Sequence, residues 1–276
     1  MRIAVAGGDL RMLTVCKLLA EHGFECTLFG FGNLLGASEP EFGAAVNEAA
    51  AVILPLPFSK GGNLYAPFCE KTVAAEEALA LCGNNSLILV GGTDKEASNT
   101  VDYSRCETLL LKNAFITAEA ALSIAMNEMK RTVFGSQAVI LGYGRIGSFL
   151  AKMCRSLGAR VSVVARKSEA RALAEASGMN ALPFCEAEKA LSTADTVFNT
   201  VPSLVLDRRA LSAIGKQACV IELASLPGGI DREEARRQHV KVIEALGLPG
   251  KYAPASAGSA IAETIIPILL ERGITP

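Results

Sequence analysis

Short apolar runs rich in β-branched residues alternate with longer amphipathic stretches along most of the chain. This pattern favours an α/β fold with mainly parallel sheets. In the first part of the sequence the runs expected to form strands are Arg2–Ala6, Glu25–Phe29, Ala51–Leu54, Ser86–Val90 and Thr108–Leu111. The periodicity between them predicts helices over Leu10–Ala20 and Glu70–Leu81, whereas Leu34–Asn47 gives no clear prediction. This half of the chain is therefore expected to be flavodoxin-like.

The pattern changes after residue 116. Thr117–Val133 has alanine, leucine and methionine on one face and charged residues nearer the other, which predicts a long connecting helix. A second series of expected strands follows, namely Gln137–Leu141, Arg160–Ala165, Ala181–Phe184, Thr196–Thr200, Ala218–Leu223 and Val240–Ala245. A final helix is expected over about Gly258–Glu271, and Pro267 should bend it by removing a backbone hydrogen bond.

These elements predict two doubly wound parallel-sheet domains with a cleft between them. Residues 1–116 form the N-terminal flavodoxin-like substrate domain, and we expect the helix within 256–276 to pack back on it. Residues 117–133 are the connecting helix, and 134–255 are expected to form an NAD(P)-binding Rossmann domain.

Charge and cysteine usage exclude several classes of protein. Lys and Arg total 27 against 28 Asp and Glu, so nothing favours nucleic acid or an anionic membrane as a partner. No segment approaches the roughly 18 consecutive apolar residues of a membrane span, and the apolar run Met1–Gly8 is too short for a signal peptide. We therefore expect a cytoplasmic protein. Eight cysteines without a Cys-x-x-Cys pair are interpreted as reduced core thiols, with a redox role as the alternative and no metal site.

The motif Gly142-Tyr143-Gly144-Arg145-Ile146-Gly147 follows an expected strand and opens an expected helix over Arg145–Leu157. The first two glycines permit a tight turn and close approach of a pyrophosphate, and Gly147 lets the helix pack on the sheet. The open amides at the helix start then favour phosphate. All six residues are predicted to bind a dinucleotide; the alternative is an ordinary glycine-rich turn.

The end of the next strand bears on which dinucleotide binds. An NAD site places Asp or Glu there for the ribose 2′-hydroxyl, but this chain has Ala165-Arg166-Lys167-Ser168. Arg166 can make a bidentate contact to a 2′-phosphate, with Lys167 and Ser168 adding charge and a donor. We therefore expect NADP rather than NAD; the alternative is a solvated strand end. Further contacts are expected from Thr200, Val201, Pro202, Ala224 and Ser225, which follow two later strands.

With these segments in view, the chain resembles the A subunit of dipicolinate synthase along nearly its whole length. The resemblance rests on Gly7-Gly8-Asp9-Leu10-Arg11, Ile53-Leu54-Pro55, Thr117-Ala118-Glu119, Gly135–Arg145, Asn199-Thr200-Val201-Pro202-Ser203, Leu223–Gly229 and Gly247-Leu248-Pro249-Gly250. It implies a two-domain, NADP-linked oxidoreductase that works with a flavoprotein-like B subunit. That enzyme converts a cyclic product of dihydrodipicolinate synthase into pyridine-2,6-dicarboxylate in the mother cell of a spore-forming bacterium.

The chain departs from the family pattern on the substrate side. Pro254-Ala255-Ser256-Ala257-Gly258 stands where the family has Pro-Lys-Thr-Ala-Gly, so no lysine is given a role. Glu222 replaces the commoner Asp, and Ala120 replaces a glycine.

The expected substrate is a dicarboxylate, so its binding site should contain cations or open backbone amides. This requirement selects the candidate substrate-binding residues. Gly8, Asp9 and Arg11 lie after the first strand, where an open sheet binds ligands. Arg11 is expected to clamp a carboxylate or to be an exposed charge, and Asp9 to be an N-cap. Ser59, beside Lys60 on a possible lid, and Ser256 and Gly258, expected to open the last helix, complete the binding set. The catalytic residues stay unassigned, with Asp9, Arg11 and Glu119 as candidates; Glu119 is equally explained by a place in a helix's first turn.

The two histidines discriminate between reactions. His22 is expected at the end of a helix and His239 in a charged stretch, so neither serves the acid–base chemistry of a hydroxyacid dehydrogenase. Oxidation of a dihydropyridine needs little base, because aromatisation supplies driving force. We therefore expect the chain to oxidise dihydrodipicolinate. We also expect it to form a homo-oligomer. The alternatives are another NADP-linked reductase of an imino or keto acid, and a non-catalytic NADP-binding subunit that supports a flavoprotein.

Overall fold

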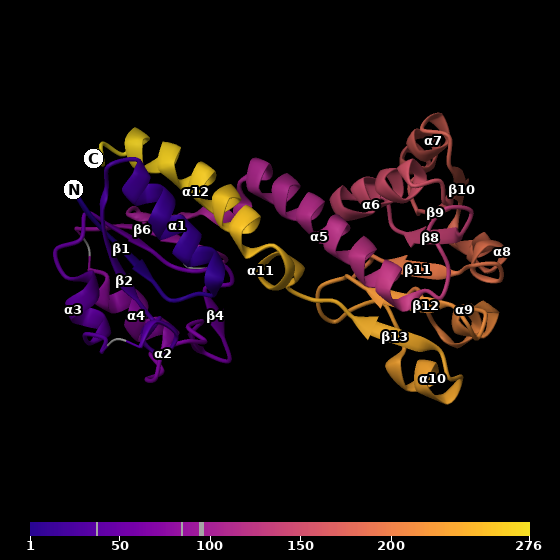
Figure 1. Ribbon diagram of the computed structural model, residues 1–276, viewed down its shortest axis with the longest axis horizontal. Coiled ribbons are helices and arrows are strands. Elements are labelled where there is room, and N and C mark those ends of the chain that lie inside the picture. Colours follow the sequence, from indigo (N-terminus) through magenta and orange to yellow (C-terminus); the bar gives the residue numbers. More distant parts are fainter. Residues whose placement is uncertain (37, 84, 94–96) are drawn as a thin grey trace. The chain divides into compact units, whose positions relative to one another are not determined.

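The computed structural model describes residues 1–36, 38–83, 85–93 and 97–276. It divides the chain into two compact units, and each is considered by itself (Figure 1). Unit 1 is made of Met1–Asn113 and Pro249–Pro276, so its chain is discontinuous. Unit 2 is Ala114–Leu248.

Unit 1 is built on a five-stranded parallel sheet. Its strands are β1 (Arg2–Ala6), β2 (Glu25–Phe29), β3 (Ala51–Ile53), β6 (Leu87–Val90) and β7 (Thr100–Asp102). Their order is β2-β1-β3-β6-β7, with neighbouring strands parallel throughout. The order reverses between β1 and β3, as in flavodoxin-like sheets. The predicted fold class is therefore confirmed for this unit.

Helices and a small hairpin complete unit 1. The elements are α1 (Leu10–Glu21), α2 (Gly32–Leu35), α3 (Phe42–Val46), the hairpin β4 (Ser59–Lys60) and β5 (Asn63–Leu64), α4 (Ala75–Leu81), the 3₁₀ turn η1 (Tyr103–Arg105) and α12 (Pro254–Glu271). The stretch Leu34–Asn47, of which residue 37 lies outside the described residues, contributes to the two short helices α2 and α3. Helix α4 begins five residues later than expected.

Helix α12 lies beside α1 although more than 230 residues separate them (Figure 1). Ile261, Ile265 and Leu269 of α12 are fully buried in the same core as Ile3 and Val5 of β1. The expected packing of the last helix on the first half is thus present in unit 1. Pro267 lies within α12 and is exposed, and the helix continues through it to Glu271.

The strand expected over Thr108–Leu111 is wrong, because these residues belong to helix α5 (Glu107–Glu128). The run Thr108-Leu109-Leu110-Leu111 is apolar like a strand, but the helix-forming residues after it extend it as a helix. The fifth strand is instead β7. Helix α5 also begins ten residues before the expected connecting helix and ends at Glu128. In the described ranges α5 alone is long and apolar enough to cross a membrane, yet 56% of its most apolar stretch is buried within the protein, as in a core helix.

Unit 2 is built on a six-stranded parallel sheet. Its strands are β8 (Gln137–Leu141), β9 (Arg160–Val164), β10 (Asn180–Leu182), β11 (Thr196–Asn199), β12 (Cys219–Glu222) and β13 (Lys241–Glu244). Its shorter helical elements are α6 (Arg145–Ser156), α7 (Ser168–Ala176), η2 (Phe184–Glu186), α8 (Ala187–Leu191), α9 (Arg208–Ala213) and α10 (Arg232–Arg237), and α11 (Leu248–Tyr252) follows. The order β10-β9-β8-β11-β12-β13 is that of a dinucleotide-binding Rossmann sheet, which confirms the second fold prediction.

Candidate functional site

The loop between β8 and α6 has the backbone that the glycine motif predicts. Gly142 has a φ of +93°, and a Cβ there would overlap Thr200 Oγ1 and lie 2.9 Å from Val201 Cγ2. A Cβ on Gly147 would overlap the carbonyl of Gly142, so this glycine allows α6 to start directly against the strand end. Two of the three glycines are therefore required by the fold itself.

Gly144 is different, because a Cβ there would meet nothing within 4 Å. It is the N-cap residue of α6 and provides no side-chain cap, so the first amides of the helix are left for water or a bound anion. The Tyr143 hydroxyl beside it is buried and has no hydrogen-bond partner among the described residues. An exposed glycine at an uncapped helix start fits the phosphates of a dinucleotide.

The end of β9 exposes the predicted cations. Arg166, Lys167 and Ser168 are all exposed, whereas Ala165 is buried. Arg171, on the first turns of α7, donates from Nη1 to the carbonyls of Ala165 and Arg166 at 2.9 and 2.8 Å. This adds a third cation to the strand end, one that sequence reasoning missed because it follows in the helix.

One carboxylate lies among these cations. The Ser168 hydroxyl donates to Glu169 Oε2 at 3.3 Å. The backbone amide of Glu169 and then the Ser168 hydroxyl hold the pKa of the Glu169 carboxyl below its ordinary value. Glu169 is in the first turn of α7, so its charge also suits the helix dipole.

The loops after β11 and β12 lie at the same edge of the sheet as the glycine loop, since all these strands are parallel. Thr200 reaches that loop directly, because its Oγ1 donates to the carbonyl of Leu141 at 2.8 Å. Val201 adjoins Gly142, while Pro202 and Ser225 are exposed and Ala224 is buried. The structure therefore brings these predicted cofactor residues to one edge of unit 2.

In unit 1, the predicted residues after β1 form a compact ion pair. Asp9 is the N-cap residue of α1, as expected, and its side chain accepts from the Arg11 amide. Arg11 is only 9% exposed. Its Nε donates to Asp9 Oδ1 at 2.7 Å and its Nη2 to Asp9 Oδ2 at 2.9 Å, and Nη2 also reaches the carbonyl of Leu56. Arg11 is thus not the exposed charge of the alternative interpretation.

Gly8 and Gly250 let other segments approach this pair. The Gly8 amide donates to the carbonyl of Tyr65 at 2.6 Å, and Gly8 has a φ of +94°. A Cβ on Gly250 would lie 2.6 Å from Asp9 Oδ2. Burial, and then the nearby Asp9 carboxylate, raise the pKa of the Tyr65 phenol. Sequence reasoning missed Tyr65, because it follows the β4–β5 hairpin and only the fold brings it beside β1.

The other substrate candidates are not gathered around this pair. Ser59, like Lys60, is exposed on the hairpin, and it lines a separate cavity of about 450 Å³ with Asp102 and Arg105. Helix α12 begins at Pro254, so Ser256 lies in its first turn, as expected, whereas Gly258 lies in the second turn and does not open the helix. Gly258 is buried, and a Cβ on it would overlap the Arg11 carbonyl, so it serves the packing of α12 on α1.

Glu119 and the histidines also have definite places. Glu119 lies in the middle of α5 and is exposed, so its expected place in a first helical turn is wrong. His22 is the C-cap residue of α1, at the opposite end of that helix from Asp9. His239 precedes β13, at the amino edge of the sheet of unit 2. Neither histidine lies at the carboxyl ends of the strands in its unit.

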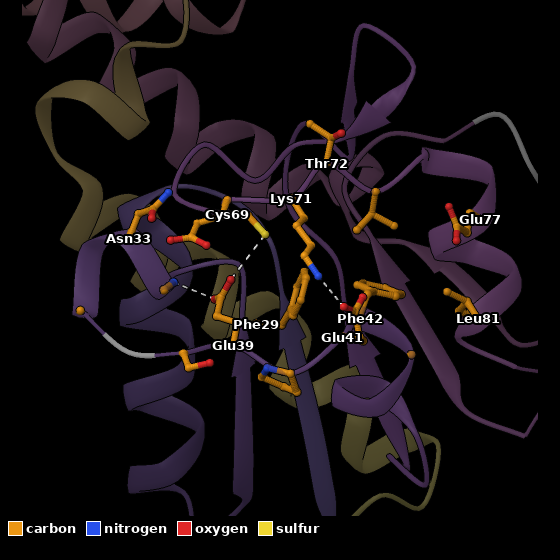
Figure 2. A pocket seen from close by; sticks show the side chains of 17 residues that line it. Phe29, Asn33, Glu39, Glu41, Phe42, Cys69, Lys71, Thr72, Glu77 and Leu81 are labelled. Carbon is orange, nitrogen blue, oxygen red and sulfur yellow. Dashed lines mark hydrogen bonds and ion pairs between the residues drawn. The ribbon is translucent and has the colours of Figure 1, made fainter.

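A cavity of about 880 Å³ in unit 1 contains none of the predicted residues (Figure 2). Glu39 is turned inward there, where Oε1 accepts from the amides of Gly30 and Gly32, each at 2.7 Å, and from that of Phe31 between them. Lys71 and Glu41, which also line the cavity, form an ion pair at 2.6 Å (Figure 2). The chain itself thus provides partners for these polar groups.

Comparison with known proteins agrees with this division into units. Residues 2–111 match the family model described as the N-terminal domain of the dipicolinate synthase A subunit. Residues 110–227 match that of the D-isomer specific 2-hydroxyacid dehydrogenase NAD-binding domain. The second match, with the geometry of the glycine loop, supports a nicotinamide dinucleotide as cofactor.

Whole-chain relatives point the same way. The dipicolinate synthase A subunit of Bacillus subtilis strain 168 is 29% identical over 98% of this chain and 96% of its own. The crystal structure of the corresponding protein from Bacillus halodurans matches with a TM-score of 0.85 at 27% identity, covering 97% of each chain. The Bacillus subtilis crystal structure matches with a TM-score of 0.83, covering 98% of this chain and 96% of that one. The resemblance found in the sequence is confirmed: the chain is similar to dipicolinate synthase A subunits along nearly its whole length.

Proposed function

We propose that this chain oxidises dihydrodipicolinate to dipicolinate with NADP, as the A subunit of a dipicolinate synthase. The observation that carries the cofactor choice is the end of β9, where Arg166 and Lys167 are exposed and Arg171 adds a third positive charge. A ribose 2′-phosphate would neutralise these cations. Similarity to the Bacillus subtilis protein supports the reaction and a second, flavoprotein-like B subunit. The proposal also includes a homo-oligomeric state and a location in the mother-cell cytoplasm of a spore-forming bacterium.

The substrate's carboxylates would meet the residues after β1. The hydrogen bonds of the described residues use Nε and Nη2 of Arg11, so Nη1 is the group proposed for a carboxylate oxygen. A phenol is protonated at neutral pH, and the upward shift in the pKa of Tyr65 acts in the same direction, so its hydroxyl is available as a donor. Asp9 orients the guanidinium and offsets its charge. A nicotinamide cofactor held at the glycine loop would supply the hydride acceptor for this two-electron oxidation, and the substrate ring would also give up one proton to become the aromatic pyridine.

The reaction is tested by mixing the chain with the B subunit, NADP and the product of dihydrodipicolinate synthase. We expect NADPH and the ultraviolet absorption of dipicolinate to appear together. Arg11→Lys and Tyr65→Phe should raise KM, since each removes a proposed substrate donor. Lys71→Ala, in the other cavity of unit 1, is the control and should change nothing. Formation of dipicolinate without NADPH would refute the proposal.

The choice of NADP is tested separately by binding. We expect the wild-type chain to prefer NADPH over NADH. Arg166→Ala should weaken the binding of NADPH by about tenfold or more, because a hydrogen bond to a charged group contributes roughly 1.5–3 kcal/mol. The affinity for NADH should not change. Glu169→Gln is the informative partner variant. If Glu169 instead accepts from a ribose 2′-hydroxyl, that variant weakens NADH, and NADP is the wrong cofactor.

A non-catalytic NADP-binding subunit is the second candidate. It is favoured by the bidentate engagement of Arg11 with Asp9 and by the position of both histidines away from the carboxyl edges of the sheets. Under this alternative the chain alone gives no turnover, the mixed pair does, and Arg11→Lys leaves the pair fully active. Loss of activity in Arg11→Lys at unchanged stability would favour the catalytic proposal.

A further inference from the structure

Glu222 is a fully buried carboxylate at the carboxyl end of β12. In the sheet it lies opposite Asn199, the last residue of β11, which is also fully buried. Asn199 Nδ2 donates to Glu222 Oε1 and Oε2 at 2.9 and 3.0 Å. The amide of Ala224 donates to Oε1 at 2.9 Å and that of Gly229 to Oε2 at 3.2 Å. Each oxygen therefore accepts from the Asn199 side chain at the end of β11 and from a backbone amide of the loop after β12.

Asn199 extends this arrangement into the loop after β11. Its Oδ1 accepts from the Val201 amide, and its Nδ2 also lies 3.1 Å from the Val201 carbonyl. The two loops approach so closely that a Cβ on Gly229 would overlap both Asn199 Nδ2 and the Val201 carbonyl. One carboxylate thus joins the segment that carries Thr200–Pro202 to the segment that carries Ala224–Ser225.

The geometry points to Glu222 as a positioning residue for the nicotinamide half of the cofactor site, an inference that rests on the proposed dinucleotide function. The strand order places β9, with its cations, on one side of β8, and β11 and β12 on the other. A dinucleotide that crosses the switch point therefore puts its adenosine near β9 and its nicotinamide near the loops joined by Glu222. Glu222 itself is buried beneath these loops and acts through them.

The four hydrogen bonds to Glu222 Oε1 and Oε2 all require these oxygens to act as acceptors. An ionised carboxylate only accepts, and all of its described hydrogen-bond partners donate. Glu222→Gln replaces one acceptor by an NH₂ group, which then faces the amide of Ala224 or Gly229 as donor against donor. Such a buried mismatch is relieved only if one loop moves. Glu222→Asp keeps both acceptors on a shorter side chain, so it should retain more of the arrangement.

The test compares two ligands on the whole chain by calorimetry. NADP spans both halves of the site, whereas adenosine 2′,5′-bisphosphate lacks the nicotinamide. Glu222→Gln should bind NADP about tenfold more weakly, the size expected for one mismatched buried polar contact. It should bind adenosine 2′,5′-bisphosphate as the wild type does, and Glu222→Asp should lose less NADP affinity. The control is Asp195→Asn, which removes an acceptor of the Gln137 amide and of Arg131 at the amino edge of the same sheet. This control variant should lower Tm, and any change in affinity should be the same for NADP and for adenosine 2′,5′-bisphosphate.

The outcomes distinguish the inference from the function on which it rests. If the wild type binds neither ligand, the proposed function fails. If it binds both, but Glu222→Gln weakens them equally or not at all, Glu222 is only a stabilising residue and the inference is overturned. Should Glu222→Gln fail to fold, the comparison is made with Glu222→Asp. That variant must then show the selective loss of NADP affinity, and an equal effect on both ligands again overturns the inference.

Discussion

Two glycines of the loop after β8 illustrate how neighbouring residues can have separate roles. Gly142 has a positive φ and lies against Thr200 and Val201, whereas Gly144 has an ordinary φ of −84° and faces open space. The first is needed to fold the loop. The second is needed only if something must come close to the backbone.

We therefore predict opposite effects for alanine at these two positions. Gly142→Ala should lower the free energy of unfolding by about 2 kcal/mol or more, from the left-handed backbone and the overlap with Thr200. Gly144→Ala should change it by less than about 0.5 kcal/mol, yet weaken NADPH by about tenfold, because its methyl group occupies the place proposed for the pyrophosphate. Urea unfolding and fluorescence titration measure the two quantities. Normal NADPH binding by Gly144→Ala would contradict the cofactor placement.

A pair of thiols in unit 1 gives a pH-dependent prediction. A hydrogen bond from Cys26 lowers the pKa of Cys16 to about 7, while burial acts in the opposite direction. The same interaction, then burial, raise the pKa of Cys26. A lowered thiol pKa means that the Cys16 thiolate forms, and reacts, at lower pH than an ordinary cysteine does.

Alkylation of Cys16 by iodoacetamide should therefore reach half its maximal rate near pH 7. In Cys26→Ala, without the hydrogen bond, that midpoint should rise by about one pH unit or more toward the ordinary value. Mass spectrometry of the labelled peptide follows the rate, and Cys185, which is exposed, is the internal reference. An unchanged midpoint in Cys26→Ala would show that the two thiols do not interact. The expectation that the cysteines are core residues holds for Cys82, Cys154 and Cys219, which are buried.

The single-residue features that sequence reasoning found are local ones. The glycine loop and the Arg166–Lys167 strand end depend on residues that are adjacent in the chain, so spacing alone predicts them. In the sequence Glu222 stands out only as a departure from a family pattern, and no local pattern marks Tyr65. Their partners come from other segments, Asn199 for the first and Gly8 for the second, and only the folded sheet brings these together.

Most strands end within one or two residues of the predicted positions. Apolar β-branched runs bounded by glycine or polar residues give this signal directly. Helix boundaries are less predictable, and the start of α12 shows why. Ala253, the N-cap residue of α12, makes no side-chain hydrogen bond, so nothing in its side chain indicates that the helix begins at Pro254. Thr108–Leu111, expected as a strand, is helical, which shows that a short apolar run does not by itself distinguish a strand from a helix.

Helix α12 offers a prediction at the scale of one element. Ile265 has no exposed surface and packs in the core that α12 shares with β1 and α1. Ile265→Ala should lower the free energy of unfolding by about 2–5 kcal/mol, as for other buried aliphatic residues. Glu271→Ala, at the exposed end of the same helix, is the control and should have little effect. A change below about 1 kcal/mol in Ile265→Ala, measured by urea unfolding, would mean that α12 contributes little to the stability of unit 1.

At the scale of the whole molecule, the cofactor is assigned to one unit of two. NADPH at about 100 times its Kd should stabilise the fold to which it binds by roughly 2.7 kcal/mol. Hydrogen exchange should slow most in unit 2, above all in peptides that contain the glycine loop and the ends of β9, β11 and β12. Unit 1 serves as the internal control. Equal protection throughout the chain, or greater protection in unit 1, would contradict the assignment.

The split of unit 1 between two stretches of chain has a consequence for biosynthesis. On the ribosome, all of unit 2 is made before Pro249–Pro276, so β1 and α1 wait for α12 while an entire second domain is translated. Domains usually fold in the order in which they are synthesised, the N-terminal one first. Here the second domain can close first, and the apolar residues of β1 and α1 stay exposed for the interval. Nascent chains arrested before residue 254 should therefore be the ones that chaperones bind, and release should follow the emergence of α12.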